Sequence, residues 1–494
     1  MAEGAARGRL LDDFGRYEIG LFAATQLGYL PIVGSLLATN FFEPPPETCA
    51  NESVVDRFHS LLAEWQLACT KRYVMWLFSM TDIMSTTLMF GGLLGAFIAG
   101  FLADRYGRKP LVVGTMGVVG ACNTLLCVLG MRSYLLTGLV LLVMGAAAGG
   151  YMVVNLVLMV EAVEHSHSRL LIVSLNGWPL AMCFTALIAF FTRHWLLYHA
   201  FVATIAFFFF AVLQCISLES VRWLTHHNHT SRAQKMIGRI AYLNSASANE
   251  HLRSGVDPSE PLKGVSEDGS MCVVKGNHAT DGNDSGTRYK YTYVDLFKHK
   301  SVGISVASLA YCFTVSSFVS FSGYFHSSLL PGNRFLSLFS MGLLKLLLGM
   351  IPFACGSYLG RRPILLTSIA VAMLCSSALT FMLSSTQFRD TDYLSMLSVL
   401  MASALDPSWK IMHLYSTELF PTGVRNMARG ICQVGARCGS VLAPIMRSFY
   451  GVYPVVSMAI CMGLLAVQWL IAFFVFPETS RCQLPDRLPT EQST

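Results

Sequence analysis

Four ionisable side chains interrupt long apolar stretches in the C-terminal half of the chain: Lys345, Asp406, Lys410 and Arg437. Such a group in a bilayer costs about 2.5–3.5 kcal/mol on insertion scales, so it usually faces a partner or a water-filled cavity. Asp406 and Lys410 are one helical turn apart and can neutralise each other, whereas Lys345 and Arg437 have no acid within a turn on their own segments. The pattern predicts a positively charged site, in which a guanidinium is suited to bidentate binding of a carboxylate.

Three of these four residues also have a purely structural interpretation. Asp406 and Lys410 can form a structural ion pair, and Arg437 can pair with Asp406 across helices. Aromatic side chains on neighbouring segments can hold the apolar body of a ligand or simply pack: Phe318, Phe321, Tyr324 and Trp409. Weaker candidates for the same site are Asn155, Asn176 and Trp178. Asp82, near the end of its segment, is expected to be solvated.

The elements that position these residues are predicted to be membrane-spanning helices. The chain has 494 residues, is 53% hydrophobic and only 13% charged, whereas a soluble protein carries about 25% charged residues. Runs of roughly 20 apolar residues predict spanning helices. These runs lie near 18–42, 75–103, 110–131, 134–158, 171–192, 195–217, 301–328, 335–357, 363–385, 393–415, 427–449 and 453–476. The prediction is an all-α membrane protein with twelve transmembrane helices in two six-helix bundles.

The expected organisation follows from these runs. It comprises an N-terminal tail 1–17, a bundle 18–217 with an outer loop 43–74, a polar loop 218–300, a bundle 301–476 and a tail 477–494. The polar loop opens with helical spacing over 225–249, which favours amphipathic helices on the membrane surface. His226, His227 and His229 lie in this loop and are interpreted as solvated histidines rather than a metal site.

Three polar signatures recur about 255 residues apart, which indicates that the two halves are duplicated. Gly107-Arg108-Lys109-Pro110 returns as Gly360-Arg361-Arg362-Pro363, Glu161 with Arg169 returns as Glu418 with Arg425, and Glu219-Ser220 returns as Glu478-Thr479. Duplicated membrane units that face a central path are typical of transporters.

The distribution of basic residues predicts the orientation. Lys and Arg are concentrated in the loops around 105–109, 169, 222–239, 361–362 and 425–429. These loops, and with them both termini, are therefore expected to be cytoplasmic. Asn51 then starts a glycosylation signal in the outer loop, where Cys49 and Cys69 are free to pair as a disulfide or to remain unpaired.

Further motifs carry a resemblance to a known family. The segment Asp104-Arg105-Tyr106-Gly107-Arg108-Lys109, which follows Gly91, Gly95 and Gly100, resembles the signature loop of the major facilitator superfamily. Three further segments resemble motifs of solute carrier family 22, the organic ion transporters. They are Glu64-Trp65-Gln66-Leu67-Ala68-Cys69, Glu219-Ser220-Val221-Arg222-Trp223-Leu224 (with valine in place of the family's proline) and the signature from Ser416 to Asn426.

The resemblance implies alternating access and small organic ions as substrates. It implies that Asp104, Arg105 and Arg108 hold the bundles together on the cytoplasmic side when the path opens outward. Matching gate pairs would come from Glu161, Arg169, Glu418 and Arg425. Organic anion carriers of the family resemble this chain in having an arginine at Arg437, whereas cation carriers have an aspartate there. Where relatives often pair tyrosines, this chain has Ser320 and Phe321.

The resulting prediction is a plasma-membrane transporter of small organic anions that lies in a lipid bilayer. One alternative is an organic cation or zwitterion carrier that uses Asp406, and a second is a non-transporting receptor on the same fold. No phosphate-binding loop, catalytic constellation or nucleic-acid-binding run is recognised, so the chain is predicted to be no enzyme and to need no cofactor or metal. The oligomeric state stays open.

Overall fold

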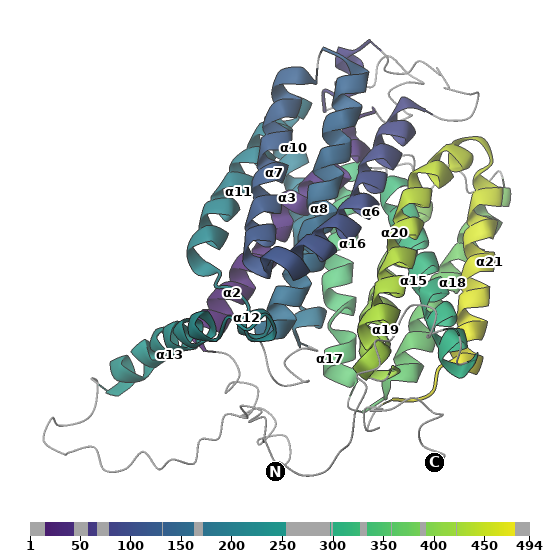
Figure 1. Ribbon diagram of the computed structural model, residues 1–494. Coiled ribbons are helices and arrows are strands. Elements are labelled where there is room, and N and C mark those ends of the chain that lie inside the picture. Colours follow the sequence, from purple (N-terminus) through teal and green to yellow (C-terminus); the bar gives the residue numbers. More distant parts are fainter. Residues whose placement is uncertain are drawn as a thin grey trace, which may run out of the picture.

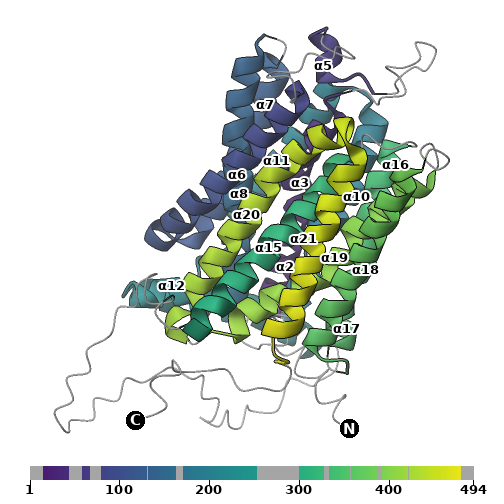
Figure 2. The ribbon, with the colours of Figure 1, turned by 90° about the vertical axis from the view of Figure 1, so that its right-hand side faces the viewer.

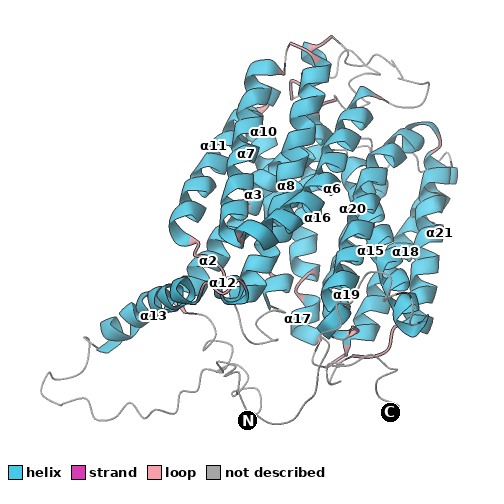
Figure 3. Ribbon diagram, viewed as in Figure 1, coloured by secondary structure: helices cyan, strands magenta, loops and turns pink. Residues whose placement is uncertain are grey.

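The computed structural model describes residues 15–43, 58–66, 79–130, 132–162, 171–252, 297, 300–326, 333–356, 358–385, 392–420 and 422–479. Cys49, Cys69, Asn51 and Arg169 lie outside these ranges, as does the side chain of Arg425. Within them the structure is almost entirely helical (Figure 3).

Among the described residues, ten helical segments are long and apolar enough to cross a membrane. Their bounds agree with the predicted runs to within a few residues. They are Arg16–Phe41 (α2 Arg16–Leu27, α3 Tyr29–Leu37 and η1 Ala38–Phe41), α6 Met80–Tyr106, α7 Arg108–Leu129, α8 Tyr134–Ala162, Leu171–Thr192 (with α10 Trp178–Thr192), α11 Trp195–Ile216, Val302–His326 (within α15 Lys300–His326), Arg334–Cys355 (α16 Arg334–Leu348 and α17 Ile351–Cys355), α18 Arg361–Ser384 and α21 Pro454–Val475. Two further long helices, α19 Asp392–Glu418 and α20 Thr422–Val452, carry three of the four charged residues of the predicted site, namely Asp406, Lys410 and Arg437.

The helices form two bundles that stand side by side (Figures 1 and 2). One bundle contains the helices from α2 to α11, and the other contains those from α15 to α21. Between them in sequence come α12 Val221–His226 and α13 Thr230–Leu252, which lie at one end of the bundles. We call this the α12 end, and we call the opposite end, at which α5 Leu61–Glu64 lies, the α5 end (Figure 2).

The tightest helix packing joins α6 to α8 through glycines. A Cβ on Gly95 would lie 1.9 Å from the carbonyl oxygen of Ala146, and one on Gly145 would lie 1.9 Å from that of Leu88. Gly91 is nearly as close to α8, with 2.1 Å from its Cβ position to the Leu142 carbonyl oxygen, but Gly100 has nothing within 4 Å. Small residues let membrane helices approach this closely, so the predicted glycine packing face holds for Gly91 and Gly95 and ends before Gly100.

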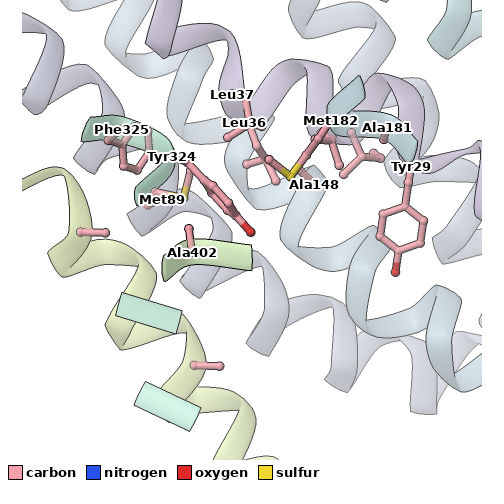
Figure 4. Packing of buried hydrophobic residues seen from close by; sticks show 14 of the residues in the cluster. Tyr29, Leu36, Leu37, Met89, Ala148, Ala181, Met182, Tyr324, Phe325 and Ala402 are labelled. Carbon is pink, nitrogen blue, oxygen red and sulfur yellow. The ribbon is translucent and has the colours of Figure 1, made fainter. Parts of the chain in front are cut away.

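One cluster of buried apolar side chains runs through both bundles. Figure 4 shows part of it, with Leu36 and Met182 from the N-terminal bundle and Tyr324 and Ala402 from the C-terminal bundle. The bundles are therefore packed against each other over part of their length.

The repeated signatures meet in space, and they do so in the same way in each half. Gly107 has a φ of 107°, and the Glu219 carboxylate accepts the Arg108 N–H at 2.7 Å. In the second half Gly360 has a φ of 77°, and Glu478 accepts the Arg361 N–H at 2.9 Å. A carboxylate at a helix N-terminus satisfies free N–H groups and complements the helix dipole. The duplication read from the sequence is thus a structural one.

Candidate functional site

A cavity of about 140 Å³ lies between the two bundles. A water molecule needs only about 10–15 Å³ by this measure, so the space admits a small organic molecule. Both bundles contribute to its wall. The lining residues are Tyr29, Met152, Leu156, Asn176, Trp178, Pro179, Ser317, Ser320, Phe321, Tyr324, Lys345, Leu405, Asp406, Trp409, Lys410, His413, Gln433, Ala436 and Arg437.

Interrupted helices supply several of these residues. The first spanning segment breaks at Gly28, next to Tyr29, and the helix before α10 ends at residues 175–177, next to Trp178. A third break, at Gly349 and Met350, follows Lys345 by one turn. Broken helices at a bundle interface are where membrane transporters place polar groups toward a ligand.

Asp406 holds both lysines of the cavity. Its carboxylate oxygens lie 3.8 Å from Nζ of Lys345 on α16 and 3.8 Å from Nζ of Lys410 on its own helix. All three side chains are almost fully buried, with 7% exposure for Asp406, 3% for Lys345 and 2% for Lys410. Asp406 and Lys410 therefore form the expected same-helix pair. Lys345 has no acid within one turn on its own helix and instead pairs with Asp406 across the interface between α16 and α19.

Arg437 on α20 lines the same cavity without an acidic partner. No carboxylate of the described residues lies within 4 Å of its guanidinium, and its Nη2 instead approaches the Met152 sulfur at 4.0 Å. Nε of Arg437 has no hydrogen-bond partner among the described residues. The ion pair with Asp406, which the sequence left open as an alternative, does not form in this structure.

Aromatic side chains form the wall next to the charges. Phe321 and Tyr324 of α15 pack edge to face at 5.2 Å, and Trp178 lies 5.7 Å from Phe321 across the bundle interface. Trp409 lines the cavity beside His413, with ring centroids 5.5 Å apart. Phe318, which was predicted to belong to this wall, is buried but is not among the lining residues.

The lining residues that were not anticipated include Tyr29, Met152, His413 and Gln433. His413 follows Lys410 by three residues and so shares its helix face, which is a signal that the sequence does contain. Nothing in the local sequence marks the other three, because their position depends on how the two bundles meet.

The gating residues at the α12 end pair within each bundle. Arg108 lies 3.0 Å from Asp104 and 3.3 Å from Glu161. In the second half Arg361 contacts Glu418. Arg105 is exposed and lies over the ring of Tyr106 at 5.6 Å. Asp104, Arg105 and Arg108 were predicted to join the bundles when the path opens outward. That role stays a prediction.

Ionic contacts between the bundles occur instead at the α5 end. Arg447 of α20 lies 2.9 Å from Asp82 of α6 and 3.0 Å from Glu43, while Arg334 of α16 donates to the Glu43 carbonyl at 2.8 Å. Asp82 is only 2% exposed. The expectation that it is solvated was wrong, because α20 brings a cation and the Ser448 hydroxyl against it.

The comparison with protein families decides what this architecture is. The family model described as "Sugar (and other) transporter" matches residues 52–486. The chain belongs to this family of transporters. Its fold is that of the major facilitator superfamily, and the prediction that the chain is not an enzyme agrees with this membership.

Similar proteins support the membership. Solute carrier family 22 member 12 of Homo sapiens is 26% identical over 467 residues, covering 92% of this chain and 77% of that protein. Solute carrier family 22 member 6-A of Xenopus laevis is 25% identical over 447 residues, covering 88% and 72%. The organic cation/carnitine transporter 2 of Mus musculus is 28% identical over 442 residues, covering 87% and 71%. The resemblance to solute carrier family 22 is therefore confirmed, and one of these similar proteins is named for organic cations and carnitine.

Solved structures show the same fold. The xylose transporter XylE from E. coli, in a partially occluded inward-open conformation, gives a TM-score of 0.61 at 16% identity, covering 95% of this chain and 100% of that chain. Its inward-open form gives 0.61 at 15% identity, covering 94% and 97%. The family match and the membrane-spanning helices together make this protein a multi-pass membrane transporter.

Proposed function

We propose that the protein carries small organic anions across the plasma membrane by alternating access, with Arg437 as the group that binds the substrate's carboxylate. The observation that carries the proposal is the position of Arg437, which lines the cavity between the bundles and has no acidic partner among the described residues. A guanidinium in that situation favours an anionic guest that restores its hydrogen bonds.

The charges around the cavity support this assignment. Lys345, Lys410 and Arg437 line it together with one carboxylate, that of Asp406. Because both lysines already contact Asp406, a cation that approached this carboxylate would meet two ammonium groups. Phe321, Tyr324 and Trp178 are placed to pack against the apolar body of the same substrate.

We further propose that the α12 end faces the cytoplasm and that this structure is an inward-facing state. The ion pairs of Arg447 tie the bundles together at the α5 end, whereas the ion pairs of Arg108 and Arg361 at the α12 end stay within one bundle each. In the outward-facing state Asp104, Arg105 and Arg108, with Glu161, Glu418 and Arg425, would make the contacts at the α12 end.

The test compares uptake of a labelled aromatic monocarboxylate with that of a quaternary ammonium ion in cells that express the chain. Arg437→Ala is expected to lower the apparent affinity for the carboxylate about 10- to 100-fold, because a charge-assisted hydrogen bond contributes about 1.5–3 kcal/mol. Arg132→Ala, a change at an exposed arginine, is the matched control and should leave uptake unchanged.

One outcome would contradict the anion assignment. If the quaternary ammonium ion is transported, and its uptake survives Arg437→Ala and Lys345→Ala but is lost in Asp406→Asn, the protein is a cation carrier that uses Asp406. Uptake of a zwitterion that requires both Arg437 and Asp406 would place the substrate between these classes and would equally reject a simple anion.

A further inference from the structure

Three potential metal ligands meet at the α5 end, away from the cavity. They are His59, Glu64 and His194, and their ligand atoms all lie within 4.8 Å of one another. Nε2 of His59 is 2.8 Å from Oε2 of Glu64, and the rings of His59 and His194 stack with centroids 5.0 Å apart. Each side chain is exposed or half-buried, so an ion in solution can reach all three.

Backbone contacts hold the two segments that carry these ligands. The His59 N–H donates to the Arg193 carbonyl at 2.8 Å, and the Trp195 N–H donates to the His59 carbonyl at 3.1 Å. The two histidines therefore face each other across an isolated β-bridge although 134 residues separate them. Glu64 ends the short helix α5, whose first turn is capped by the Ser60 hydroxyl. The site is fixed by the fold and does not have to be assembled from free loops.

We propose that His59, Glu64 and His194 form a binding site for a divalent transition-metal ion of the Zn²⁺ type. Two imidazoles and one carboxylate are a ligand set that zinc uses with a water molecule in the fourth position. Tetrahedral ligands at zinc lie about 3.4 Å apart. Nε2 of His59 and Oε2 of Glu64 are 2.8 Å apart and must separate, whereas the wider separations, which reach up to 4.8 Å, must close. Shifts on the order of 1 Å are enough, and side chains at this degree of exposure can make them.

Two hydrogen bonds must be given up when a metal binds. The bond between Nε2 of His59 and Oε2 of Glu64 is replaced by bonds from both atoms to the ion. Nδ1 of His194 accepts the Leu196 N–H at 3.2 Å, and this bond is lost because metal binding through Nε2 places a proton on Nδ1.

An ion at this site would act on the contact between the bundles. Phe58, next to His59, packs against Phe335 of α16 with ring centroids 6.4 Å apart, and the Arg334 guanidinium lies 5.6 Å from the Phe58 ring. Fixing His59 to His194 fixes Phe58 in this contact. Zinc added at the α5 side is therefore expected to hold the α5 end closed and to slow uptake.

The decisive experiment measures Zn²⁺ binding by the purified full-length chain in nanodiscs. The protein is stripped with a chelator, its thiols are blocked with N-ethylmaleimide so that cysteines cannot bind the metal, and Zn²⁺ is titrated against a chromophoric chelator. One Zn²⁺ per chain is expected at micromolar concentration. His59→Ala, Glu64→Gln and His194→Ala should each weaken binding about tenfold or more, whereas His227→Ala, a change at an exposed histidine beyond α12, should not.

Two results would overturn the proposal: no bound Zn²⁺ in the unchanged chain, or undiminished binding in the three variants. Glu64→Gln keeps the side-chain shape and so guards against the possibility that a histidine variant fails to fold. A second readout is the melting temperature, which Zn²⁺ should raise in the unchanged chain and in His227→Ala but not in Glu64→Gln. Both measurements are independent of transport, so the site can fail while the proposed substrate stands.

Discussion

Replacing Gly95 with leucine is expected to prevent the transporter from folding into a stable, monodisperse protein. A Cβ at this position would lie 1.9 Å from the Ala146 carbonyl oxygen and 2.4 Å from its Cα. Those atoms belong to the backbone of α8 and cannot swing aside as a side-chain end can. Helices α6 and α8 would have to separate, so the cost should exceed the about 1–3 kcal/mol of ordinary overpacking.

Gly100 on the same helix provides the matched control. Nothing lies within 4 Å of a Cβ built there, and leucine favours a helix by somewhat under 1 kcal/mol relative to glycine. Gly100→Leu should therefore match or slightly exceed the melting temperature of the unchanged chain, as measured by thermal unfolding with size-exclusion chromatography in detergent. An equal melting temperature for Gly95→Leu would show that α6 and α8 do not approach as closely as the structure has them.

Local sequence predicted the membrane segments because their signal is local. The apolar length of a spanning helix is fixed by the bilayer thickness, so the ends of α7 and α18 could be expected within a few residues. The glycines before Asp104 predicted close packing on α6. They did not reveal that the partner is α8, or that Gly100 lies outside the contact.

The candidate site was predictable only in part, because local sequence does not show which helices meet. Ionisable residues in apolar segments are costly, which is why Lys345, Asp406, Lys410 and Arg437 stood out before their distances were known. The acid that neutralises Lys345 is on another helix, and no spacing rule could assign it. The trio of His59, Glu64 and His194 combines two neighbouring residues with a third that lies more than a hundred positions away, so local sequence did not reveal it.

Asp82 was expected to be solvated because it lies near a helix end, and Arg447, also near a helix end, was not recognised as its partner. A charge near the end of a spanning segment normally reaches the aqueous interface. Here the α5 ends of α6 and α20 lean together, so that Asp82 and Arg447 are only 2% and 5% exposed. Their contact crosses the bundle interface, which makes it part of the closure of the transporter at this end.

Removing the Arg447 charge is expected to open the α5 end. In Arg447→Met the carboxylates of Asp82 and Glu43 lose the cation that lies 2.9 and 3.0 Å away. Breaking a buried ion pair in this way costs about 3–5 kcal/mol, and only the closed state bears this cost. The equilibrium between the closed and open states should therefore shift on the order of 10²–10³-fold.

The shift can be followed by labelling a cysteine placed at the closure. Phe335 is 9% exposed and stacks on Phe41 across the interface at 5.6 Å, so Phe335→Cys reports opening at this end. In nanodiscs, a bulky maleimide should label this cysteine much faster in the chain that also carries Arg447→Met than in the chain with Phe335→Cys alone. Labelling of the native cysteines is measured in the matching chains that lack Phe335→Cys and is subtracted. Arg132→Met, at an exposed arginine, should not change the rate.

Neutralising the carboxylates should reverse the effect. In the triple variant Glu43→Gln, Asp82→Asn and Arg447→Met no unpaired charge is left in the closed state, and replacing a whole buried ion cluster by neutral groups is often tolerated. Slow labelling should return. If Arg447→Met labels no faster than its parent although it is folded, the ion pairs do not govern closure of the α5 end.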